Sequence, residues 1–119
     1  MANVYTTVGK QKVVDYIDGT AVIPTYYVHW GTGAGTAAVG DTTLFTAAAE
    51  SRVATSQSQP AADTNQFQGT ITSSSGQTIT NAGIFDASTS GNLLLKSDFT
   101  GIALLTGDSI QFTFTLQQT

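Results

Sequence analysis

The chain has 119 residues and a formal net charge of −4, and its charged fraction of 10% is less than half of the usual value of about 25%. This composition argues against a disordered chain, because disordered chains combine low hydrophobicity with high charge. The only cations are Lys10, Lys12, Arg52 and Lys96, which are scattered and form no basic stripe, so no nucleic-acid partner is expected. The chain has no cysteine, which excludes disulfides and thiolate metal sites.

Two further classes of protein do not fit the sequence. No segment approaches the roughly 18 apolar residues that span a bilayer, so no membrane partner is expected. The start, Met1–Val4, lacks the basic and apolar regions of a secretory signal, and we expect synthesis in the cytoplasm.

The N-terminal part is rich in β-forming side chains. Val4–Val8 is a short strand candidate, and Lys12–Ile17 and Thr20–Ile23 flank the pair Asp18-Gly19. Asp-Gly between β-forming segments favours a type I′ turn, in which both central residues have positive φ. These residues therefore predict a β-hairpin.

The next part mixes strands with irregular structure. Thr25–Trp30 is aromatic and β-branched and predicts a strand, which ends at the glycine-rich loop Gly31–Gly35. Asp41–Ala49 is the helical candidate, because its first residues can cap one or two turns. Glu50–Ser58 is interpreted as a polar strand, and Gln59–Asp63 as a loop.

The remaining residues alternate between apolar and polar side chains. Asn65–Ser73, Gln77–Phe85 and the segment from Leu93 are predicted strands with turn residues between them. Ser109–Leu116 alternates without a break, and neighbouring side chains of a strand point to opposite faces. The chain therefore ends in a half-buried strand with one apolar face, formed by Ile110, Phe112, Phe114 and Leu116.

About eight short strands with regular turn signals predict an all-β fold, an antiparallel β-sandwich or jelly-roll-like domain with at most one short helix. We expect one domain over residues 1–119, in which residues 1–24 form an N-terminal hairpin or arm and residues 25–119 form the core.

The loop Gly31–Gly35 superficially suggests a phosphate-binding loop. A dinucleotide site needs a glycine spacing that is absent here, followed by a helix in a parallel βαβ unit. No adequate helix follows and no lysine stands in the P-loop position, so a flexible loop is the better interpretation and no cofactor is expected.

His29 is the only histidine and lies beside Trp30 in the aromatic strand. A Ser-His-Asp triad would hold it against a buried carboxylate, and one histidine without cysteine leaves too few ligands for zinc. Because Val28 and Trp30 share the opposite face, we expect His29 to be exposed or in an interface. No catalytic residue and no metal ligand is predicted.

Most carboxylates fall at predicted turns, where aspartate caps backbone N–H groups. A calcium site between two loops and a glycosidase pair of carboxylates are open alternatives, although no spacing selects either of them. The turn residues are Asp18, Asp41, Asp63, Asp86 and Asp108.

Tyrosine is well suited to protein interfaces, because it is large, rigid and amphipathic. Tyr26 and Tyr27 are neighbours on one strand, so one must point outward if the other points inward. The candidate partner-contact residues are Tyr5, Tyr16, Tyr26, Tyr27 and His29.

A series of turn and core motifs runs through roughly residues 25–116. The motifs are Val28–Gly33, Asp41–Leu44 with Glu50 and Arg52, Phe67–Ile71, Ile79–Ala87, Gly91–Leu94, Phe99 and Gly107–Ile110. This layout resembles small β-rich structural proteins of tailed bacteriophage virions, which are capsid decoration (cement), head-fibre or tail components. The resemblance implies a fold and a virion setting, and it carries no catalytic motif.

The leading hypothesis is a capsid cement protein on the surface of a phage head, which bridges and stabilises major capsid subunits. The expected partners are the major capsid protein or another virion protein and further copies of the chain, as a dimer or trimer. The alternative is a phage tail component, either an adaptor or a fibre or receptor-binding module. A small hydrolase or lectin-like protein is the third hypothesis, and we expect no enzyme.

Overall fold

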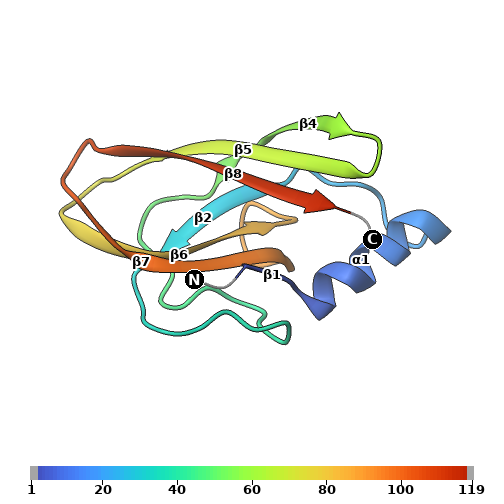
Figure 1. The fold of residues 1–119 in the computed structure, drawn as a ribbon, viewed down its shortest axis with the longest axis horizontal. Helices are drawn as coiled ribbons and strands as arrows, with labels where there is room; N and C mark the ends of the chain where they lie inside the picture. Colours follow the sequence, from blue (N-terminus) through green and yellow to red (C-terminus); the bar gives the residue numbers. More distant parts are fainter. Residues whose placement is uncertain (1–2, 118–119) are drawn as a thin grey trace.

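The computed structural model describes residues 3–117 and arranges them in two packed antiparallel sheets and one helix (Figure 1). One sheet has the strand order β1-β7-β6-β2-β3, and the other has the order β4-β5-β8. The predicted antiparallel sandwich with about eight strands and one short helix is therefore confirmed. The elements are β1 (Asn3–Tyr5), α1 (Thr7–Asp18), β2 (Tyr27–Gly31), β3 (Val53–Ala54), β4 (Ser56–Ala61), β5 (Thr64–Thr72), β6 (Gln77–Phe85), β7 (Leu93–Leu104) and β8 (Ser109–Gln117).

The predicted N-terminal hairpin is wrong, because residues Thr7–Asp18 form the helix α1. Thr6 caps the helix, and its hydroxyl accepts a hydrogen bond from the Gly9 N–H at 2.9 Å. Gly19 has a φ of 82° and ends the helix in the left-handed conformation. The Asp18-Gly19 pair is therefore a helix end and not a hairpin turn. Within residues 3–117, no helix is long and apolar enough to cross a membrane.

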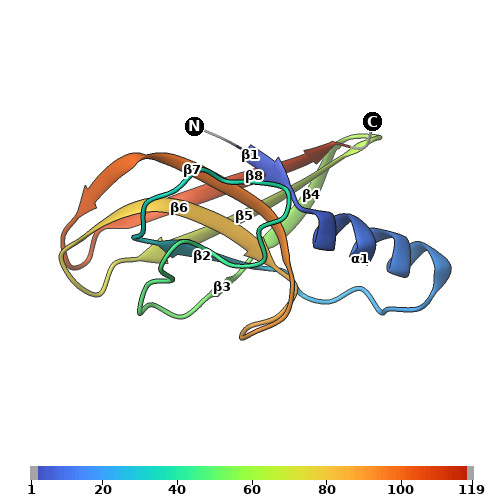
Figure 2. The same cartoon turned by 90° about the horizontal axis from the view of Figure 1, so that it is seen from below.

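The N-terminal segment packs against its own sandwich. β1 pairs with β7, with Val4 opposite Lys96. The hydroxyl of the fully buried Thr6 also donates to the carbonyl of Leu93. Gly9 lies so close to Leu94 that a Cβ atom would stand 2.8 Å from the Leu94 Cα. These contacts fix α1 at one end of the sandwich, as Figure 2 shows.

The main core lies between the two sheets. Val28 and Trp30 of β2 are fully buried there, and the Trp30 ring meets Phe112 of β8 edge-on at 6.2 Å. The predicted alternation of β8 is confirmed, since its apolar residues are buried or half-buried and its polar residues are exposed. On β5, Phe67 and Ile71 point into the same core.

The long segment of residues 32–52, called here the covering segment, lies across the five-stranded sheet on the side away from β5 and β8 (Figure 1). The helix predicted for Asp41–Ala49 does not form, and Ala47 makes an isolated bridge to Gly31 instead. The loop predicted for Gln59–Asp63 is also wrong in part, because β4 continues to Ala61.

Side chains of β6 and β7 hold the covering segment in place. The Asn81 amide accepts from the Phe45 N–H at 3.0 Å and donates to the Phe45 carbonyl at 3.1 Å. The Lys96 ammonium donates to Asp41 and to the Thr43 carbonyl. Hydrogen bonds from the side chains of Asn81 and Lys96 therefore take the place of backbone pairing with a neighbouring strand. The covering segment needs no regular secondary structure of its own.

Candidate docking surfaces

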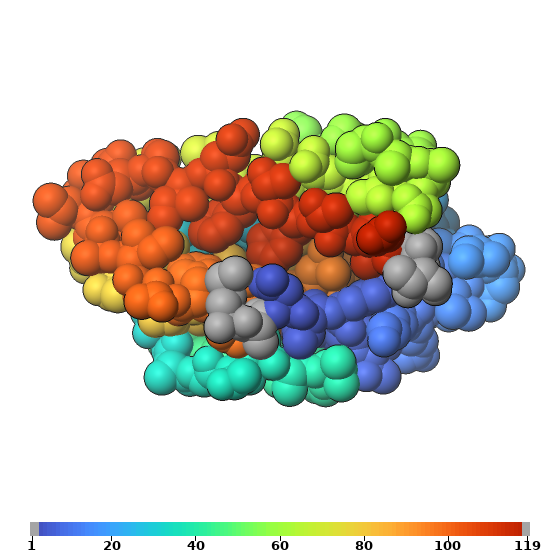
Figure 3. Space-filling view, in the orientation of Figure 1, coloured from blue at the N-terminus to red at the C-terminus, as the bar shows by residue number. Residues whose placement is uncertain are grey.

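An apolar groove opens between the two sheets, between β8 on one side and the edge formed by β1 and β7 on the other (Figure 3). We call it the inter-sheet groove; its volume is about 660 Å³. The Phe112 ring contacts two other aromatic rings, with its centroid 6.4 Å from the centroids of both Phe99 and Phe114. The apolar lining residues are Val4, Tyr5, Leu95, Phe99, Ile102, Phe112, Phe114 and Leu116.

Lys96 is the only charged residue of the groove lining. Its ammonium lies 3.0 Å from the Asp41 carboxylate and 3.3 Å from the centre of the Phe45 ring. The charge is therefore already neutralised by the covering segment. Partial desolvation would raise the pKa of Asp41, but hydrogen bonds from the Ala38 N–H and from Lys96 outweigh it and lower that pKa. The groove thus offers a partner apolar surface and uncharged polar groups.

A second apolar surface lies at the free end of α1 and in the residues that follow it. Val14 and Ile17 are exposed on the helix, and Val22 and Ile23 are exposed after it. We call these four residues the helix-end patch. It adjoins one end of the sandwich (Figure 2), away from the β7–β8 turn.

The structure brings three of the predicted contact tyrosines together. Tyr26 is buried, and Tyr5 and Tyr16 pack against the core cluster that contains it. Burial, together with a hydrogen bond to Tyr16, raises the pKa of Tyr26. Tyr5 lines the inter-sheet groove, whereas the half-buried Tyr27 belongs to the opposite face of β2. Whether these tyrosines contact a partner stays a prediction.

Of the two alternatives expected for His29, exposure is wrong, because only 7% of this residue is accessible. Its contact with a partner stays a prediction. The covering segment lies over the outer face of β2, which the alternation alone assigns to solvent. The His29 Nε2 hydrogen-bonds to the Glu50 carbonyl at 2.7 Å. Burial lowers the pKa of His29 despite this hydrogen bond.

Glu50 is the centre of a hydrogen-bond network that the sequence analysis did not predict. One carboxylate oxygen accepts from the Trp30 indole N–H at 2.8 Å. The other accepts from the Ser74 N–H at 2.9 Å, the Ser74 hydroxyl at 2.8 Å and the Gln77 amide at 2.6 Å. Partial desolvation would raise the pKa of Glu50, but these hydrogen bonds outweigh it and lower the pKa to about 2. Glu50 therefore joins the covering segment to β2, to β6 and to the turn between β5 and β6, and it is an anion at neutral pH.

Four of the five aspartates predicted at turns accept from a backbone N–H as expected, whereas Asp63 accepts from the side chains of Thr64 and Gln117. Asp86 accepts from the Asn92 N–H at 2.7 Å across the β6–β7 loop, and Asp108 accepts from the Leu105 N–H at 2.8 Å. In the part of the chain that the structure describes, no group of three or more acidic or histidine side chains could hold a metal ion.

A comparison with protein families finds a match for this chain. Residues 4–117 match the family described as "Podophage GP4 fiber I protein gp80". The chain belongs to this family. A comparison with curated proteins finds no match. This match confirms the prediction of a phage virion structural protein. It covers nearly the whole sandwich, including the N-terminal segment that the motifs of the sequence analysis do not reach.

Proposed function

We propose that this chain is an assembly module of a phage fibre, which acts by binding other virion proteins and not by catalysis. The observation that carries the proposal is the family match over residues 4–117, which names a fibre protein. The surface chemistry supports it, because the inter-sheet groove and the helix-end patch are apolar and lack unpaired charge. Burying such surfaces desolvates few ions and so favours protein contacts.

The capsid cement role is the second candidate. A rigid sandwich with few charges also suits a protein that bridges capsid subunits and stabilises the mature shell by mass action. The fibre role ranks first because the family description specifies a fibre. Both roles predict a location on the virion surface and differ in which structure carries the protein.

Labelling of intact virions separates the two roles. Gold-labelled antibody fragments against the purified chain would be imaged on virions, with virions that lack the gene product as the control. We expect label on fibres. Label over the head shell, together with lower thermal survival of the particles that lack the protein, would favour cement and overturn the fibre proposal. Label on neither structure would overturn both.

A further inference from the structure

The four edge strands of the two sheets differ in how well they resist pairing with another chain. Short length, proline and bulges are the features that protect a strand edge. β1 has three residues and β3 has two, while β4 contains Pro60 and an irregular register against β5. These three edges are therefore poor templates for a further strand.

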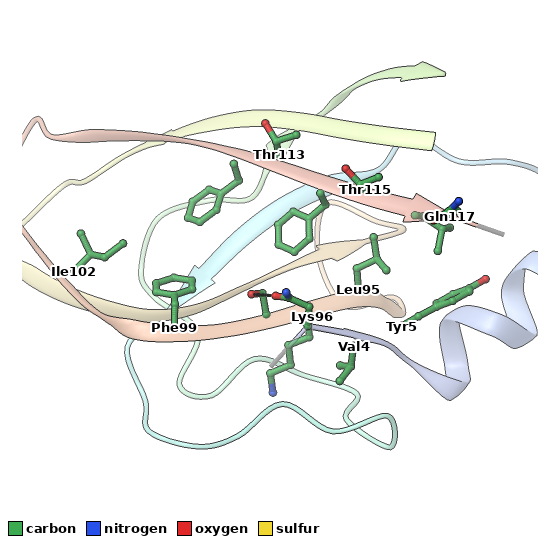
Figure 4. A pocket seen from close by; sticks show the side chains of 14 residues that line it. Val4, Tyr5, Leu95, Lys96, Phe99, Ile102, Thr113, Thr115 and Gln117 are labelled. Carbon is green, nitrogen blue, oxygen red and sulfur yellow. Dashed lines mark hydrogen bonds between the residues drawn. The ribbon is translucent and has the colours of Figure 1, made fainter. Parts of the chain in front are cut away.

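β8 has none of these protections. It is nine residues long and contains neither a charged residue nor a proline. Its pairing with β5 runs without a bulge from Ser109 to Gln117. In an antiparallel ladder only part of the backbone groups bond to the one neighbour, so β8 presents a row of N–H and C=O groups at its free edge. This edge borders the inter-sheet groove (Figure 4).

The side chains of β8 are self-complementary about its central residue. Reversing the strand around Thr113 exchanges Phe112 with Phe114 and Ile110 with Leu116. Two copies paired antiparallel in this register would thus place aromatic opposite aromatic and aliphatic opposite aliphatic on the inner face. The outer face would pair only uncharged polar residues: Ser109 with Gln117, Gln111 with Thr115, and Thr113 with itself.

We propose that the free edge of β8 pairs with β8 of a second copy of this chain, in antiparallel register centred on Thr113. Such pairing would join the two three-stranded sheets into one continuous sheet and extend apolar cover over the half-buried Phe112 and Phe114. The complementary pattern and the absence of charge on β8 favour a second copy as the partner. The proposal does not rest on the fibre role, since it is tested on the isolated chain.

Cysteine cross-linking tests this register, because the chain has no cysteine of its own. Residues opposite each other in an antiparallel pair have Cα atoms about 4.5–5.5 Å apart, within the range that a disulfide bridges. The Thr113→Cys variant should therefore form a covalent dimer under mild oxidation. Thr70→Cys is the matched control, because Thr70 is also exposed but lies on the neighbouring strand β5. It should cross-link far less.

A mixing experiment tests the register independently. Gln111→Cys and Thr115→Cys should cross-link to each other more readily than either does to itself, because the proposed register places these two positions opposite one another.

Charge substitution at the same position gives a reversible readout. Like charges directly opposite each other weaken strand pairing, so Thr113→Lys and Thr113→Glu should each raise the dimer dissociation constant up to about fivefold in sedimentation experiments. Mixing the two variants should restore or tighten the dimer. Thr70→Lys should leave the constant unchanged.

Either of two results overturns the proposal. The first is a wild-type chain that sediments as a monomer at its highest soluble concentration, or as a trimer. The second is a Thr113→Cys variant that cross-links no more than Thr70→Cys. Neither result would affect the location of the protein on the virion, so the fibre proposal stands or falls separately.

Discussion

Substitution of Glu50 tests whether its hydrogen bonds hold the covering segment against the sandwich. Replacing it with Gln keeps the size of the side chain but exchanges one acceptor oxygen for an NH₂ donor. Both oxygens of Glu50 accept hydrogen bonds, from Trp30 on one side and from Ser74 and Gln77 on the other. The new NH₂ group of the Glu50→Gln variant must therefore face a donor on one side. An unsatisfied polar group of this kind costs about 1–3 kcal/mol.

The lost charge adds a contribution that depends on pH. The pKa of Glu50 falls from 4.5 to about 2 in the folded chain. This shift corresponds to at most about 3 kcal/mol, and solvent screening at the partly exposed carboxylate reduces the effect to about 1–2 kcal/mol. Because the folded pKa is depressed, this stabilisation is complete above the unfolded pKa of 4.5 and is lost as the pH falls toward 2.

Urea unfolding, followed by the fluorescence of Trp30, measures this effect. Trp30 is the only tryptophan and donates directly to Glu50, so its emission reports on the site itself. We expect Glu50→Gln to lower the free energy of unfolding by about 2–5 kcal/mol at neutral pH. The difference from wild type should shrink by about 1–2 kcal/mol as the pH falls from about 5 toward 2.

The exposed carboxylate of Asp63 provides the control. It also accepts hydrogen bonds, from Gln117 and Thr64, but at the surface. The Asp63→Asn variant should leave the unfolding midpoint nearly unchanged across this pH range. If the difference between wild type and Glu50→Gln does not depend on pH, the reasoning about the Glu50 charge is refuted.

Three further substitutions test other contacts by chemical denaturation. Asp41→Asn should destabilise the fold by about 2–3 kcal/mol, because it removes the counter-charge of the fully buried Lys96. Gly31→Ala should cost about 1–3 kcal/mol, since its Cβ would stand 2.5 Å from the Phe45 carbonyl oxygen. Thr6→Ala should cost about 1–2 kcal/mol through the lost helix cap and reduce helical circular dichroism, while Thr6→Ser should retain most of the stability. An unchanged midpoint in any of these variants would contradict the corresponding contact.

The strands were predictable because their information is local. Gln77–Phe85 has the bounds that its sequence predicts, and β8 follows directly from its alternation. The helix was not predictable in the same way. Asp18-Gly19 suits both a hairpin turn and a helix end, and the β-branched residues of α1 favour strands. The deciding contacts are Thr6 with Leu93 and Gly9 with Leu94, which join residues far apart in the sequence.

The same limit explains the errors around the candidate site. The sequence pattern assigns His29 correctly to the face opposite Val28 and Trp30, but it does not show that residues 32–52 cover this face. That cover depends on single side chains, such as Asn81 holding Phe45 and Glu50 holding Ser74. Such long-range hydrogen bonds leave no periodic pattern in the sequence, because each one needs only a single residue in each of the two segments that it joins.

The motif Asn81–Phe85 shows what a sequence motif of this sandwich specifies. Ala82 and Ile84 face the main core, whereas Asn81, Gly83 and Phe85 face the covering segment or its small second core. A Cβ atom at Gly83 would stand 2.8 Å from the Leu95 carbonyl oxygen, so a larger residue would push the backbone of β7 away. Each residue of the motif therefore has a packing role in this sandwich. The motif specifies the fold and leaves the partner undetermined, so specific recognition must depend on surfaces outside it. The free edge of β8, which we propose as a contact between copies, is such a surface, because its exposed polar residues can change without changing the core.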